Sequence, residues 1–154
     1  MSILISSFIL LQIILFFVIT FHDWVHLPPL TDIRALEKNS STKGRVINSL
    51  IFALFVLIPL ALTWEYAPYF PTWALGVIIV FYGVLSLGTI ASWWIPYFFG
   101  SPDTHKKAFA EYENTHHFLP ARGDNIVPNT FHVILHVLIW SCFFIACYLL
   151  SMAR

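Results

Sequence analysis

Six of the seven histidines of this 154-residue chain lie in three short stretches, with His105 outside them, and they are its main candidates for chemistry. Two of these stretches, HDWVH and HVILH, repeat the spacing HxxxH. Residues four apart lie on one face of a helix, so each pair of imidazoles can hold one metal ion between them. The second pair is expected at a helix N-terminus, which favours the neutral imidazole that binds a metal. These stretches supply the predicted metal ligands His22, His26, His132 and His136.

A third stretch, EYENTHH, adds a carboxylate to the candidate set. Glu113 and His116 have the i, i+3 spacing at which one helix offers a carboxylate and an imidazole to a shared ion. His117 follows directly, points about 100° away on a helix, and serves a second metal or none. Asp23 and His26 repeat the same three-residue spacing. We therefore predict His116 and His117 as further metal ligands, and Glu113 and Asp23 as carboxylate ligands or a general base.

Each motif also has an interpretation without chemistry. Side chains at a membrane interface account for the HDWVH pair, and hydrogen bonding between helices accounts for the HVILH pair. An ordinary solvated loop accounts for EYENTHH. The case for a site depends on the three stretches occurring together at one depth.

Composition indicates which elements position these residues. Hydrophobic residues make up 58% of the chain, whereas soluble domains contain about 45–50%. Four segments approach or exceed the roughly 20 apolar residues that cross a bilayer, namely 3–21, 46–64, 73–98 and 130–152. The first lacks a preceding basic residue and exceeds the about 7–15 apolar residues of a signal peptide, so we expect a retained helix. The sequence predicts one all-α domain over 1–154, an integral membrane four-helix bundle with up-and-down connectivity.

Basic residues predict how these spans are oriented. Seven of the eight lysines and arginines lie in the connections 22–45 and 99–129, at Arg34, Lys38, Lys43, Arg45, Lys106, Lys107 and Arg122. The positive-inside rule then predicts a multi-pass cell-membrane protein with both long connections in the cytoplasm and both termini outside. Every histidine falls at or near the cytoplasmic face in this arrangement.

Each long connection is predicted to contain a short amphipathic helix. The first follows Thr31, which can cap the segment DIRALEK. The second begins after Gly100 and is predicted to reach about His116. The fourth span is expected to be capped by Asn129 or Thr130. Tryptophans near the end of the third span are predicted to be interfacial, at Trp93 and Trp94.

Other function classes are excluded or left open by simple observations. A net charge of zero provides no basic face for nucleic acid. Cys142 and Cys147 are five residues apart, which places them on different faces of a helix and excludes a disulfide between them. The absence of CxxCH excludes c-type haem attachment. A haem held axially by His136 together with His22 or His26 stays open.

The histidine motifs resemble those of the membrane histidine-box family, the desaturases and hydroxylases. The two HxxxH pairs are similar to the HxxxH boxes of that family, and Glu113-x-x-His116-His117 is similar to its HxxHH box with glutamate in first place. This resemblance covers the motif residues alone. It implies a multi-span protein with two irons at its cytosolic face and oxidative chemistry.

Three functions follow as hypotheses. The first is a membrane protein that binds iron, zinc or manganese and acts as a metalloenzyme on a lipid or another membrane-soluble substrate. The second is a non-catalytic accessory subunit that docks on a larger membrane protein. The third is a haem-binding electron carrier. All three share the lipid bilayer as a partner.

Overall fold

A computed structural model describes residues 3–153 of the chain, except for the side chain of Asn39. Every regular element in this range is a helix, and four helices are long and apolar enough to cross a membrane. They are α1 (Ile3–Phe21), α3 (Thr42–Tyr66), the continuous run Thr72–Phe99 and α7 (Thr130–Met152). The prediction of an all-helical chain with four apolar spans is confirmed. These helices indicate a membrane protein.

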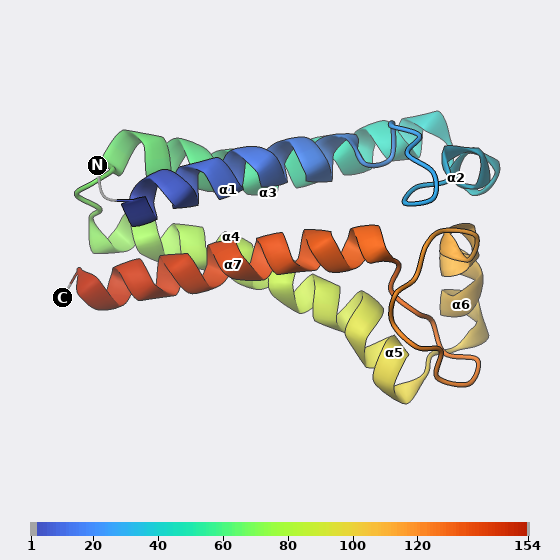
Figure 1. Cartoon of the computed structure of the whole chain (residues 1–154). Coiled ribbons are helices and arrows are strands. Elements are labelled where there is room, and N and C mark those ends of the chain that lie inside the picture. The colour runs from blue at the N-terminus through green and yellow to red at the C-terminus, as the bar shows by residue number, and fades with distance from the viewer. Residues whose placement is uncertain (1–2, 154) are drawn as a thin grey trace.

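The run Thr72–Phe99 is not uniform. It consists of α4 (Thr72–Thr89), a π-helical turn η1 (Ile90–Trp94) and α5 (Ile95–Phe99). Such turns interrupt regular helices at functional sites more often than elsewhere. Figure 1 shows α5 diverging from the other long helices at the end of the molecule where α2 and α6 lie.

The long helices alternate in direction, with the two chain ends at one end of the molecule and the two long connections at the other (Figure 1). α1 packs against α3 and α7, and α4 packs against the same two helices. Apolar side chains from all four helices fill the space between them. The fully buried members include Phe8, Leu15, Val56, Leu75, Ile78 and Tyr82.

One buried hydrogen bond joins α1 to α3 across this core. Gln12 Nε2 donates to Thr63 Oγ1 at 3.0 Å, and the Thr63 hydroxyl donates to the Pro59 carbonyl at 2.8 Å. Polar contacts between apolar helices fix how far one helix is shifted along the other. This bond therefore helps to set the height at which the HDWVH stretch leaves α1.

The first long connection contains α2 (Ile33–Asn39). Its cap is Asp32, whose carboxylate accepts from the Arg34 backbone N at 3.1 Å. The prediction that Thr31 caps this helix is wrong. The Thr31 hydroxyl instead donates to the Val25 carbonyl at 2.7 Å, which closes the turn before the helix.

The second long connection contains α6 (Asp103–Phe109) and a 3₁₀ turn, η2 (Ala110–Tyr112). The predicted extension of this helix to about His116 is wrong. The His116 backbone N donates to the Pro29 carbonyl at 2.7 Å, and the Thr130 backbone N donates to the His116 carbonyl at 2.8 Å. These bonds to distant segments replace those that a longer helix would make.

Candidate functional site

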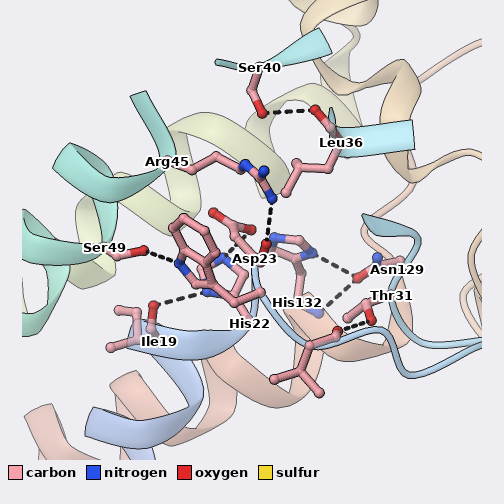
Figure 2. A network of polar contacts seen from close by, with 12 residues as sticks. Ile19, His22, Asp23, Thr31, Leu36, Ser40, Arg45, Ser49, Asn129 and His132 are labelled. Atoms are coloured by element: carbon pink, nitrogen blue, oxygen red, sulfur yellow. Dashed lines mark hydrogen bonds and ion pairs between the residues drawn. The ribbon is translucent and has the colours of Figure 1, made fainter. Parts of the chain in front are cut away.

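Hydrogen bonds in the first turn of α7 determine which ring nitrogen of His132 carries the proton. Asn129 caps this helix, because its Oδ1 accepts from the His132 backbone N at 2.8 Å. The same Oδ1 lies 2.8 Å from His132 Nδ1 (Figure 2). A backbone N–H can only donate, so the amide oxygen must face it, and Nδ1 must then carry the ring proton. The lone pair of His132 is therefore on Nε2. Asn129 Nδ2 donates to Thr115 Oγ1 at 2.9 Å, which fixes the amide from its other side.

His136, one turn further along α7, has the opposite pattern. The indole of Trp94 donates Nε1–H to His136 Nδ1 at 3.1 Å. Since an indole nitrogen only donates, His136 Nδ1 carries the lone pair and Nε2 carries the proton. His132 and His136 are 7% and 1% exposed, with ring centroids 6.1 Å apart. One buried ring thus offers an acceptor and its neighbour offers a donor.

A third imidazole, His22, joins this pair from the end of α1. Its Nδ1 donates to the Ile19 carbonyl at 2.9 Å, and its Nε2 lies 3.1 Å from Asp23 Oδ1 (Figure 2). Both ring nitrogens face acceptors, an arrangement that an imidazolium satisfies fully. The His22 ring is 6.1 Å from the His132 ring, edge to face. The structure therefore brings His22, Asp23, His132 and His136 to one region.

Arg45 holds the backbone beneath the His22–Asp23 pair. Its Nη1 donates to the Asp23 carbonyl at 3.2 Å, and its Nη2 lies 3.4 Å from Glu37 Oε1. The guanidinium also stacks over the Trp24 ring at 4.8 Å, and the residue is 7% exposed. A buried guanidinium with these partners ties the end of α1 to α2 and α3.

Tyr112 closes the same region from the second connection. Its ring lies 4.7 Å from that of His132 and 5.3 Å from that of Trp93. Burial raises the pKa of the Tyr112 hydroxyl above its ordinary value, and the carboxylates of Asp23 and Glu111 raise it further. The hydroxyl therefore stays protonated and is a donor at every physiological pH.

These side chains form the polar end of a cavity of about 470 Å³. Its polar lining comprises His22, Asp23, Asn48, Thr89, Ser92, Tyr112, His132 and His136. The remaining wall is largely apolar and includes Ile51, Phe52, Phe55, Val84, Leu85 and Ile139. Ile51 on α3 and Val84 on α4 are 47% and 50% exposed, so the cavity opens sideways between these two helices. A cavity with a polar end and an apolar side opening suits an amphipathic molecule.

The other predicted site residues lie apart from this cavity. His26, Glu113 and His116 are exposed, and the His116 ring bonds Thr130 Oγ1 at 2.7 Å. His117 Nε2 donates to the Tyr112 carbonyl at 3.0 Å. Because the helix ends at Tyr112, Glu113 and His116 do not share a helical face as the spacing predicted.

The residues of the histidine cavity form an incomplete set of ligands for a metal or a haem. Within residues 3–153, no three His, Cys, Asp or Glu side chains are grouped closely enough to hold an ion. His132 Nε2 alone has the free lone pair and the oriented ring of a metal ligand. His136 presents a proton on Nε2 and uses its lone pair for Trp94, so it does not fit an axial haem ligand. Metal binding stays a prediction from the sequence.

Several residues of the site escaped the sequence-based prediction. Trp93 is 6% exposed and its ring lies 4.2 Å from that of His132, so it packs within the site. Trp94 is half-buried and is the hydrogen-bond donor to His136. The spacing Asn129-x-x-His132 was a usable signal, because a capping amide reaches the residue three positions later. Comparisons with models of protein families, with curated proteins and with solved structures found no match to this chain.

Proposed function

We propose that this protein binds a membrane-soluble, amphipathic molecule in the cavity between α3 and α4. The polar head of the molecule would lie against His132, His136 and Tyr112, and its apolar tail would leave between the two helices. The single observation that carries this proposal is the pair of oppositely protonated imidazoles lining the cavity. Ionisable side chains within apolar spans usually face such a cavity and mark a functional site.

The proton pattern selects the head group. A hydroxyl donates one hydrogen bond and accepts others, so it can donate to His132 Nε2 while accepting from His136 Nε2–H. A carboxylate cannot donate, and a quaternary ammonium can do neither. We therefore propose an alcohol-type head. His132 Nε2, which accepts this hydrogen bond, can also take the hydroxyl proton, and this gives the site an acid–base capacity.

Metal-assisted chemistry on the same substrate class is the rival proposal, with iron, zinc or manganese held by His132 Nε2 and by His22 Nε2 once that atom is released from Asp23. The oriented Nε2 lone pair of His132 is the observation that favours it. His26, which the sequence predicts as a metal ligand, lies outside the cavity and is therefore the control position for both proposals.

The test measures the thermal unfolding midpoint of the protein in nanodiscs with dodecanol, dodecanoate or dodecyltrimethylammonium. A ligand that binds only the folded state stabilises it, and we expect dodecanol at about ten times its dissociation constant to raise the midpoint by about 4 °C. The shift should disappear in His132→Leu and persist in the matched variant His26→Leu. Equal shifts with all three heads, or a shift that survives His132→Leu, contradict the proposal. Stoichiometric metal that His132→Leu loses and His26→Leu retains supports the rival.

We also propose that the connections 22–45 and 99–129 face the cytoplasm, on the distribution of basic residues. A cysteine at Thr42, exposed at the start of α3, should resist an impermeant thiol reagent in intact cells. A cysteine at Tyr69, which is 89% exposed in the turn at the other end, should react. Cys142 is buried and both native cysteines lie within α7, so they give a low background. Ready labelling at position 42 reverses the orientation.

A further inference from the structure

A second hollow lies on the outer side of α4 and α7. It has a volume of about 710 Å³ and presents only apolar surface. Its lining comprises Gly83, Ser86, Leu87, Ile90, Trp94, Phe98, Trp140, Phe143 and Phe144. None of these residues lines the histidine cavity, so the two hollows are separate. We refer to it as the aromatic groove.

The groove is deep at Gly83 because this residue has no side chain. A β-carbon at Gly83 would lie 3.4 Å from the Phe143 ring, so glycine keeps the floor of the groove low at that point. Leu87 and Phe144, on the two rims, are 67% and 65% exposed. An entirely apolar hollow on a candidate membrane span excludes a polar occupant and suits a hydrocarbon chain.

The side chain of Arg122 places a positive charge at one end of the groove. The guanidinium of Arg122 lies 4.8 Å from the centre of the Phe98 ring and 5.2 Å from that of Tyr97. Phe98 belongs to the groove and is the second-last residue of its span, so Arg122 lies where the span ends. Stacking on aromatic rings orients a guanidinium and leaves its N–H donors available.

Arg122 has no carboxylate partner within residues 3–153. The nearby Asp124 is already engaged: its hydrogen bond with Lys106 lowers the pKa of the Asp124 carboxyl below its ordinary value. Asp124 is therefore paired with Lys106 and not with Arg122. The arginine fork is thus open to an anion from outside the chain, and guanidinium matches the geometry of a phosphate.

We propose that an anionic phospholipid binds here, with one acyl chain in the aromatic groove and its phosphate on Arg122. Charge complementarity selects the anionic head, and the apolar lining selects the chain. This proposal does not rest on the proposed function, because the two hollows have no lining residue in common and their ligands have different head groups; Trp94 lines the groove and bonds His136 from outside the histidine cavity. A basic residue near the membrane surface contributes about a fivefold preference for anionic over zwitterionic lipid.

The test uses quenching of tryptophan fluorescence by lipids brominated on their acyl chains. The full chain is placed in phosphatidylcholine vesicles that contain a small fraction of brominated phosphatidylglycerol or, separately, brominated phosphatidylcholine. Trp94 and Trp140 line the groove, so a bound brominated chain lies against them. We expect the anionic lipid to associate about five times more strongly than the zwitterionic one.

Arg122→Gln should reduce that ratio to about one while leaving the helical content unchanged, because the side chain is exposed. Arg34→Gln, which removes another exposed arginine at the same end of the molecule, should leave the preference intact. Equal association of the two lipids with the wild type overturns the proposal, as does a preference that survives Arg122→Gln. Failure of both lipids to quench also overturns the proposal.

Discussion

Replacing Asn129 by leucine is expected to lower the free energy of unfolding by about 3 kcal/mol. Asn129 is 1% exposed and makes three hydrogen bonds, two through Oδ1 to His132 and one through Nδ2 to Thr115. Loss of the helix cap costs about 1 kcal/mol. Leaving a buried imidazole N–H without a partner costs about 1–3 kcal/mol more, whereas the Thr115 hydroxyl keeps its bond to the Tyr112 carbonyl.

Thermal unfolding in detergent, followed by circular dichroism, measures this effect as a midpoint about 6–12 °C lower. Asn129→Asp is the matched control. Aspartate keeps an oxygen for the backbone N and for Nδ1 of His132, loses the donor to Thr115, and adds a negative charge that the N-terminus of α7 stabilises. We expect it to lose less than half as much stability as leucine. A leucine variant as stable as the wild type would show that this amide does not organise the start of α7.

The helices were predictable because each requires only a long apolar run. The boundaries were less accurate for a local reason. The second span was predicted over 46–64, whereas α3 is Thr42–Tyr66. Ser41 Oγ accepts from the Gly44 backbone N at 3.1 Å, so a capped polar turn precedes the apolar part. Hydropathy locates the membrane-crossing portion of a helix and does not register such a turn.

The candidate site was only partly predictable, because its decisive contacts join residues far apart in the chain. The bond from Trp94 to His136 spans 42 residues, and no local pattern indicates it. The bonds that end the helix before His116 likewise reach Pro29 and Thr130. HxxxH spacing correctly paired His132 with His136 on one helix. It could not show that Asn129 and Trp94 give the two rings opposite protonation patterns, which makes one ring an acceptor and the other a donor.

Replacing Gly88 by phenylalanine is expected to abolish the stabilisation by dodecanol while leaving the fold intact. Gly88 lines the cavity on α4, and a β-carbon there meets no atom within 4 Å. A side chain at this position can therefore occupy the space that the alkyl tail needs. Helical glycine is less favourable than other residues by about 0.5–1 kcal/mol, so the substitution itself should not destabilise α4.

Gly76→Phe is the matched control on the same helix. A β-carbon at Gly76 also meets nothing within 4 Å, but this residue does not line the cavity. We expect the midpoint shift with dodecanol to remain about 4 °C in Gly76→Phe and to fall below about 1 °C in Gly88→Phe, with Gly88→Ala between them. Equal shifts in the two phenylalanine variants would place the alcohol outside the cavity. The rival metal proposal gives a different expectation, because neither glycine can change the metal content of a site held by His132 and His22.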